Sequence, residues 1–191
     1  MSRSYLILYG LGGSGPEHWQ SWLYEELIAR GEKVYYPDFP NYDHPIKEEW
    51  LRRLAEVLET VPEEEELTVV AHSLGCILWI HYAIAAKVKL ANRLILVCPP
   101  SIHTRLEEVA SFFPVPDSLD MVGKSANTGV VVLSTDDPYC RMEDHIPYQR
   151  LHLPSVLLPG VGHLNVASGY GPWPDMLELC LNGHFPLWEQ G

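Results

Sequence analysis

One stretch of the sequence decides the fold: Leu67-Thr-Val-Val-Ala71-His72-Ser73-Leu74-Gly75-Cys-Ile-Leu-Trp-Ile80. Its apolar, β-branched first half predicts a buried strand, and its apolar second half continues as a helix. Ser73 falls at the turn between the two, where a nucleophile elbow strains the serine backbone and exposes its hydroxyl above a parallel sheet. The backbone N–H of Leu74 then lies at a helix N-terminus, where partial positive charge can hold an oxyanion. The stretch therefore predicts acyl transfer, provided that a base and an acid follow.

The rest of the chain alternates strand-like and helix-like segments. Six strands are predicted from short apolar runs, at residues 5–9, 34–36, 67–71, 93–98, 130–134 and 156–158. Most of these runs are continuous, which is typical of parallel strands buried on both faces. Helices are predicted from apolar residues at helical spacing, over residues 19–28, 46–58, 77–88, 142–151 and 173–181. This alternation predicts a three-layer α/β/α sandwich around a six-stranded parallel sheet. We expect the strand order 2-1-3-4-5-6, in which the third strand lies beside the first and the loop after Tyr9 meets the turn at Ser73.

Composition and charge limit the function classes. The chain has 191 residues, of which 47% are hydrophobic and 20% charged, and this predicts one globular domain over residues 1–191. The net charge of −12 argues against binding to nucleic acid or to an anionic membrane surface. No continuous apolar run is long enough to cross a bilayer, and the N-terminal residues do not resemble a signal peptide.

The cysteines indicate the kind of cellular compartment in which the protein works. They lack any CxxC spacing and are scattered along the chain, at Cys76, Cys98, Cys140 and Cys180. This pattern predicts reduced thiols rather than a metal knuckle or a disulfide framework. We therefore expect a cytoplasmic protein with a small-molecule substrate, and the sequence identifies no protein partner.

The base and the acid that Ser73 requires follow it in the chain. A serine hydroxyl becomes a nucleophile when an imidazole takes its proton, and a carboxylate orients that imidazole. Asp136 and Asp137 follow the fifth predicted strand, and His163 lies in a glycine-rich loop after the sixth. The order of serine, acid and histidine is that of α/β-hydrolases, and it places all three groups at one edge of the sheet. Spacing alone leaves Asp136 and Asp137 as alternatives.

The loop after the first predicted strand is expected to hold the second donor of an oxyanion hole. It reads Tyr9-Gly10-Leu11-Gly12-Gly13-Ser14-Gly15, and the N–H of Leu11 is our choice for the donor, with Gly12 as the alternative. Gly12 and His18 are also candidates for substrate binding. So are Phe112 and Phe113, for which a flap over the acyl pocket and plain core packing both stay open. This chemistry needs no metal and no cofactor.

The motifs together resemble a known family. They are residues 10–22 (Gly-Leu-Gly-Gly-Ser-Gly-Pro-Glu-His-Trp-Gln-Ser-Trp), Ala71-His-Ser-Leu-Gly75, Ser134-Thr-Asp-Asp-Pro138, and Gly162-His-Leu-Asn165 with Trp173-Pro. In this order they resemble the small serine hydrolases that include retinoblastoma-binding protein nine and the YdeN-like bacterial proteins. The resemblance implies an α/β-hydrolase fold without a large cap domain, a triad of Ser73, Asp137 and His163, and hydrolysis of small esters or amides. Ala71 replaces the first glycine of the usual Gly-x-Ser-x-Gly elbow, and we expect only a small shift in packing.

Two other functions remain as alternatives. Gly10-x-Gly12-x-x-Gly15 follows a predicted strand, precedes a helix and is followed by Asp38, which is the spacing of an NAD-type dinucleotide-binding Rossmann domain. That interpretation leaves the ordered serine, aspartate and histidine unexplained, and Pro16 removes an N–H that a phosphate could use. The second alternative is a hydrolase-fold protein kept mainly for binding a partner. The favoured prediction is a serine hydrolase of the carboxylesterase or amidase/peptidase type.

Overall fold

The computed structural model of the protein describes residues 2–184. Its strands are β1 (Arg3–Leu8), β2 (Lys33–Tyr35), β3 (Glu66–His72), β4 (Ala91–Val97), β5 (Ala126–Ser134) and β6 (Ser155–Leu158). Its α-helices are α1 (Trp19–Ala29), α2 (Lys47–Leu58), α3 (Leu74–Ala86) and α4 (Pro174–Asn182). Its 3-10 helices are η1 (Glu107–Phe112), η2 (Leu119–Met121), η3 (Gly123–Ser125), η4 (Met142–Leu151) and η5 (Val166–Ser168). Every strand and helix predicted from the sequence is present, although residues 142–151 form a 3-10 helix.

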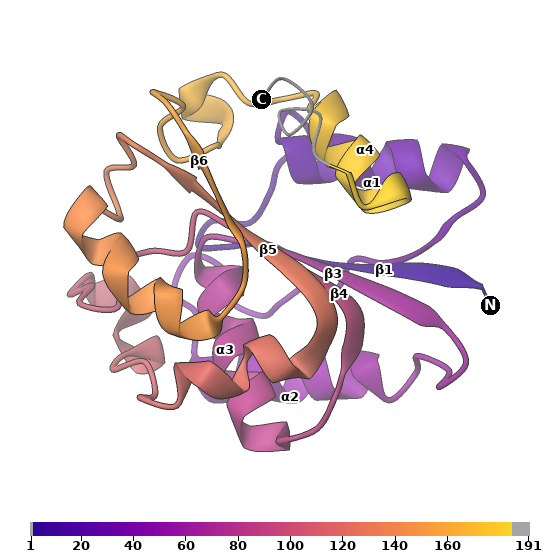
Figure 1. Cartoon of the computed structure of the whole chain (residues 1–191), viewed down its shortest axis with the longest axis horizontal. Helices are drawn as coiled ribbons and strands as arrows, with labels where there is room; N and C mark the ends of the chain where they lie inside the picture. Colours follow the sequence, from indigo (N-terminus) through magenta and orange to yellow (C-terminus); the bar gives the residue numbers. More distant parts are fainter. Residues whose placement is uncertain (1, 185–191) are drawn as a thin grey trace.

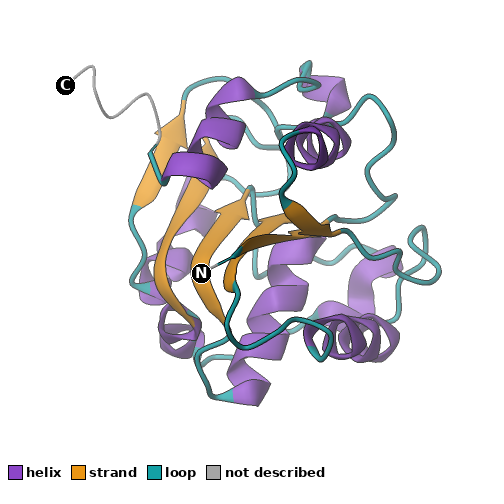
Figure 2. Ribbon diagram, turned by 90° about the vertical axis from the view of Figure 1, so that its right-hand side faces the viewer, coloured by secondary structure: helices purple, strands orange, loops and turns teal. Residues whose placement is uncertain are grey.

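The strands form one parallel, six-stranded sheet in the order β2-β1-β3-β4-β5-β6, which confirms the predicted topology. Figure 1 shows α1 and α4 on one face of the sheet and α2 and α3 on the other, and Figure 2 shows the layers from the side. Between β4 and β5 the chain forms only the short helices η1, η2 and η3, so no large cap covers the described residues. None of the described helices is long and apolar enough to cross a membrane.

Side chains of β1 alternate between two layers of the core. Leu6 and Leu8 belong to the layer that contains the buried side chains of α2 and α3, whereas Tyr5 and Ile7 belong to the layer under α1 and α4. All four side chains are almost fully buried. Removing apolar surface from water stabilises the fold by roughly 25 cal/mol for each Å². Because both faces of the sheet are covered, its strands read in the sequence as continuous apolar runs.

The sheet has a topological switch point between β1 and β3. The chain leaves β1 toward α1 on one face and leaves β3 toward α3 on the other. In open parallel sheets, ligands bind outside the carboxyl ends of the strands at such a point. The loop after β1 packs tightly against the turn before α3, because a Cβ on Gly10 would lie 2.7 Å from the Cβ of Ser73.

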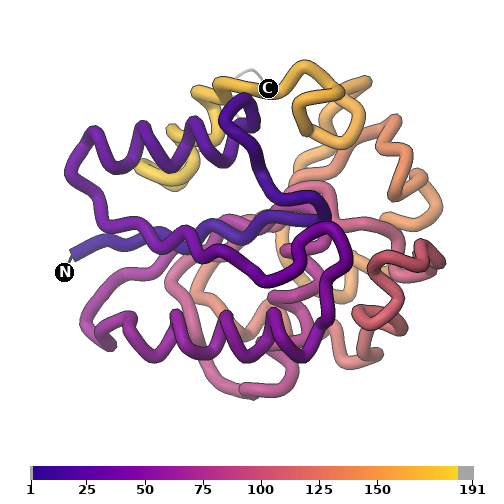
Figure 3. The backbone as a smooth tube through the Cα atoms, turned by 180° about the vertical axis from the view of Figure 1, so that it is seen from behind, coloured from indigo at the N-terminus to yellow at the C-terminus, as the bar shows by residue number. Residues whose placement is uncertain are grey.

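A contact from α1 also fixes the loop after β6, the strand at one edge of the sheet. Seen from behind in Figure 3, α1 and the C-terminal helix α4 lie along the same side of the sheet. The indole N–H of Trp19, the first residue of α1, donates to the carbonyl oxygen of Leu164 at 2.8 Å. This bond connects α1 to the loop after β6, and so the loops that follow β1, β3 and β6 are held together.

Candidate active site

Ser73 occupies a strained turn between β3 and α3. Its backbone has φ 54° and ψ −125°, and its N–H donates to the carbonyl oxygen of Val97 at 3.0 Å. A positive φ is uncommon for a residue with a side chain, and strain of this kind costs about 1–3 kcal/mol. Gly75 makes the turn possible, because a Cβ there would lie 2.5 Å from the carbonyl oxygen of Leu8. The helix can therefore begin directly against β1.

His163 joins the serine to an acid. Its Nε2 lies 2.8 Å from the Oγ of Ser73, and its Nδ1 lies 2.9 Å from each carboxylate oxygen of Asp137. Because a carboxylate only accepts, Nδ1–H donates to Asp137, and Nε2 is left to accept the hydroxyl proton of Ser73. The structure thus brings together, in one hydrogen-bonded chain, three side chains that are far apart in the sequence.

The two neighbouring aspartates have different partners. Asp137 is 4% exposed, and besides His163 it accepts a hydrogen bond from the N–H of Tyr139 at 2.9 Å. Asp136 accepts instead from the N–H of Gly162 and from the hydroxyl of Ser134, each at 2.8 Å. These two bonds, the Gly162 N–H first, lower the pKa of Asp136. Asp137 therefore faces the imidazole, while Asp136 joins the β5 turn to the histidine loop.

The backbone of His163 is fixed by neighbouring side chains. Its N–H donates to the Oγ of Ser168 at 3.0 Å, and that hydroxyl donates in turn to Asn165 Oδ1 at 3.0 Å. Its carbonyl oxygen accepts from Nε2 of His72, at the end of β3, at 2.9 Å. Sequence reasoning identifies neither His72 nor Ser168 in these positions, because no spacing signal marks them. Each bond depends on how the loop after β6 folds back on itself or on β3.

Two buried histidines adjoin the imidazole of His163. The ring of His72 lies 5.0 Å from that of His163, and the ring of His18 lies 5.1 Å from that of His72. Burial lowers the pKa of His18 to about 4 and holds the pKa of His72 well below its ordinary value. Both rings are therefore neutral at pH 7. A positive charge that forms on His163 would meet no second imidazolium beside it.

Ser73 and His163 open into a cavity of about 480 Å³, a usual size for a small-molecule site. Three more of the predicted site residues line this cavity, namely Leu11, Leu74 and His18. Among residues 2–184, no acceptor is bonded to the backbone N–H of Leu11 or of Leu74. The N–H of Leu74 also lies next to the elbow, 3.1 Å from the place where a Cβ on Gly10 would stand. Both N–H groups are thus available to a ligand.

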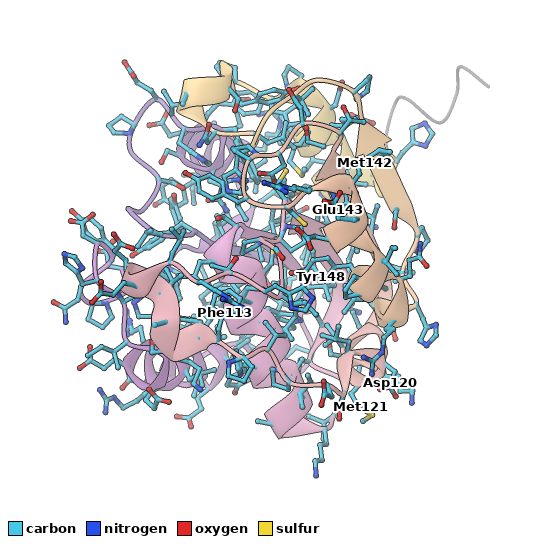
Figure 4. All side chains as sticks on the ribbon, turned by 90° about the vertical axis from the view of Figure 1, so that its left-hand side faces the viewer. Phe113, Asp120, Met121, Met142, Glu143 and Tyr148 are labelled. Atoms are coloured by element: carbon cyan, nitrogen blue, oxygen red, sulfur yellow. The ribbon has the colours of Figure 1, made fainter. Side chains whose placement is uncertain are left out.

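Three candidates for substrate binding lie outside this cavity, which corrects the sequence-based expectation. Gly12 lines a neighbouring cavity of about 230 Å³, and its N–H donates to the carbonyl oxygen of Tyr42 at 2.9 Å. Phe112 is completely buried and packs edge-on against Trp50, with ring centroids 5.5 Å apart. Phe113 lies beside η1 in Figure 4 and packs against the same core layer. Phe112 is therefore a core residue that packs on α2, and Phe113 is partly buried against the same core layer.

One group of side chains has the composition of a metal site. Cys98, Asp137 and His163 are buried and offer ligand atoms within 4.8 Å of one another, a set that suits zinc. However, the imidazole and the carboxylate already bond each other, and the Cys98 thiol lies beside Asp137. Burial, and then the charge of Asp137, raise the pKa of this thiol, so it stays protonated. The arrangement therefore favours proton transfer over metal binding.

The glycine-rich loop differs from a dinucleotide-binding turn. Gly15 precedes the start of α1, at Trp19, by several residues, whereas the last glycine of a Rossmann fingerprint packs the helix against its strand. Nδ1 of His18 accepts the N–H of Gln20 at 3.1 Å, so a side chain occupies part of the helix N-terminus that would bind a pyrophosphate. This geometry favours the hydrolase interpretation over the dinucleotide-binding alternative.

Comparison with solved structures finds the same fold in other proteins. The solved structure of the ydeN gene product from B. subtilis is similar with a TM-score of 0.77 and 23% sequence identity, over 94% of this chain and 96% of that chain. A YdeN-like protein from Pectobacterium atrosepticum gives 0.74 and 20%, over 94% and 89%. Est1E from Butyrivibrio proteoclasticus, solved with ferulic acid bound, gives 0.63 and 15%, over 87% and 85%. No curated protein matches the sequence significantly.

A match to a family model identifies the family of this protein. The model for serine hydrolases matches residues 5–181, which is most of the chain. The similar structures are too distant in sequence to show more than the fold, and the fold that they share with this chain is that of α/β-hydrolases without a large cap. The protein therefore belongs to the serine hydrolase family.

Proposed function

We propose that the protein hydrolyses small esters or amides through an acyl-enzyme intermediate, with Ser73 as nucleophile, His163 as base and Asp137 as the acid that orients the base. One observation carries this proposal: an unbroken hydrogen-bonded chain runs from the Ser73 hydroxyl through the imidazole to the buried Asp137 carboxylate. The chain opens into a cavity of about 480 Å³ that can admit a small substrate.

In the first half-reaction, Oγ of Ser73 attacks the carbonyl carbon of the substrate while Nε2 of His163 takes the hydroxyl proton. Negative charge moves onto the carbonyl oxygen, where the N–H groups of Leu74 and Leu11 donate hydrogen bonds. One such donor is worth roughly 10²–10³ in rate. The bond to the leaving group then breaks, and His163 returns the proton to the departing oxygen or nitrogen.

In the second half-reaction, water attacks the acyl-enzyme, and His163 takes one of its protons. The acid product leaves, and the proton returns to Ser73. Asp137 stabilises the imidazolium in both halves, because its carboxylate accepts Nδ1–H throughout. The neutral rings of His72 and His18 support this role, since a charged neighbour would oppose the imidazolium.

Two further parts of the proposal concern the protein as a whole. We place residues 1–191 in one domain and the enzyme in the cytoplasm. The four cysteines support a reducing compartment, because they are buried and form no disulfide.

The test is covalent labelling together with turnover. A fluorophosphonate probe should label the wild-type protein, and p-nitrophenyl acetate should be hydrolysed. Ser73→Ala should lose the label and nearly all of the turnover, whereas Ser155→Ala, which changes an exposed serine on β6, should keep both. Equal labelling and turnover in wild type and Ser73→Ala would overturn the assignment of the nucleophile.

A further inference from the structure

The mouth of the cavity at Ser73 is surrounded by partly exposed apolar side chains. Leu11, Leu106, Tyr139 and Val166 all line the cavity, and they are 38%, 43%, 47% and 44% exposed. They come from four separate segments, after β1, β4, β5 and β6. Soluble proteins rarely gather exposed apolar side chains without a function, and a ligand groove is one of the usual reasons. We call these four residues the apolar rim.

The lining of the cavity carries little charge, which suits the apolar rim. Of the Asp, Glu, Lys and Arg residues in the described chain, only Glu108 contributes to the cavity, where its side chain is exposed. His18 and His72 also line the cavity, and burial keeps both rings neutral. An anionic group that entered would meet a carboxylate without a Lys or Arg side chain to pair with. Burying an unpaired charge is costly.

We infer that the site selects substrates whose acyl group is uncharged and apolar, and extends from Ser73 onto the apolar rim. This inference rests on the proposed function and names its substrate class. The acyl carbonyl lies at the Ser73 hydroxyl, and the hydrocarbon beyond it covers Leu106 and Val166. Each methylene buried in this way improves kcat/KM by up to about fourfold, the factor that corresponds to its transfer from water.

The chain-length dependence of ester hydrolysis tests the apolar part of this inference. We expect kcat/KM to rise at least tenfold from p-nitrophenyl acetate through butyrate to hexanoate. Leu106→Ser should flatten this rise, so that the ratio of the hexanoate to the acetate kcat/KM falls several-fold below the wild-type ratio. The matched control is Leu157→Ser, because Leu157 is 44% exposed on β6 and lies outside the cavity lining. Thermal unfolding of both variants should show that they fold.

A charged ester tests the electrostatic part. The p-nitrophenyl monoester of adipic acid has the same number of carbons in its acyl group as the hexanoate, with a carboxylate at the far end. We expect its kcat/KM to be less than a tenth of the hexanoate value. Glu108→Gln should raise the ratio of the adipate to the hexanoate kcat/KM several-fold, because it removes the like charge and keeps the shape.

The outcomes separate this inference from the proposed function. If acetate is turned over and Ser73→Ala abolishes that turnover, the hydrolase assignment stands by itself. The substrate class is then wrong if acetate and hexanoate react equally well, if the adipate ester equals the hexanoate, or if Leu106→Ser behaves like Leu157→Ser. A wild-type protein that neither takes the fluorophosphonate label nor hydrolyses any ester would overturn both proposals.

Discussion

Nε2 of His72 lies 2.9 Å from the carbonyl oxygen of His163, so the residue before the elbow serine holds the backbone of the histidine that faces that serine. A carbonyl oxygen can only accept, which means that Nε2 of His72 carries the proton. The side chain is 4% exposed and its pKa is lowered by burial, so the ring stays neutral. We expect His72 to act as a positioning residue, through His163 rather than on the substrate.

The prediction for His72 rests on a pair of substitutions. His72→Phe fills the same space without the N–H, and kcat should fall roughly tenfold to a hundredfold because a displaced base loses alignment. KM should change little, because the phenylalanine ring presents to the cavity an apolar surface like that of the imidazole. His72→Gln presents an N–H at a similar reach and should recover most of the loss. If Phe and Gln at this position give the same kcat, or if KM changes instead, the hydrogen bond has no positioning role.

The two aspartates give a second prediction. Asp137→Asn should lower kcat by roughly 10³–10⁴-fold, because an amide cannot orient Nδ1–H and stabilise the imidazolium as a carboxylate does. Asp136→Asn should keep kcat within about threefold, since an amide oxygen can still accept from Gly162 and Ser134. It should lower the free energy of unfolding only slightly, because a charge-assisted bond becomes a neutral one and solvent already screens this exposed carboxylate. Single-turnover kinetics and urea unfolding measure the two effects, and a reversed ranking would contradict the geometry.

The sequence predicted most of the fold because the signals were local. Mostly continuous apolar runs marked the strands, and β1 shows the reason: alternate side chains such as Tyr5 and Leu6 are buried in opposite layers. The elbow at Ser73 was predictable for the same reason, since strand, turn and helix are consecutive. The alternation of strands and helices predicted a parallel sheet with right-handed crossovers, whereas the strand order was expected as part of the α/β-hydrolase fold.

Other features depend on contacts between distant loops, which the sequence does not encode locally. Asp136 and Asp137 occupy one turn, and only the position of the Gly162 N–H decides which carboxylate remains for His163. The N–H of Gly12 is used by Tyr42, a partner outside the glycine-rich loop. Phe112 carries no periodic signal that distinguishes a cavity wall from a core contact. In these cases the sequence indicated the right loops, but not where each carboxylate, N–H group or ring points within them.

A third prediction concerns the close approach of α3 to β1. In Gly75→Ala the new Cβ would lie 2.5 Å from the carbonyl oxygen of Leu8, so the helix must shift. We expect a loss of about 1–3 kcal/mol in the free energy of unfolding, although alanine ordinarily favours a helix. In Gly15→Ala the added Cβ would meet nothing within 4 Å, and this matched control should be neutral or slightly stabilising. Urea unfolding checks both, and equal stability of the two variants would refute the steric argument.

The fourth prediction is a loss of stability in acid caused by His18. Its pKa is about 4 in the folded protein against 6.5 for the free side chain, because burial opposes the charged form. The unfolded chain therefore binds a proton first as the pH falls. The stability that the neutral ring contributes is complete above pH 6.5 and is lost as the pH falls from 6.5 toward 4.

His18→Asn isolates this effect, because Nδ1 of His18 caps α1 by accepting the N–H of Gln20, and an asparagine oxygen can take its place. Between pH 7 and pH 5 the wild type should lose about 2 kcal/mol more than His18→Asn in urea unfolding. His103→Gln is the control, since His103 is exposed and its replacement should leave the wild-type pH dependence intact. Parallel curves for wild type and His18→Asn would mean that His18 is not the group responsible, because removing a histidine that stays neutral in the folded state must reduce the slope.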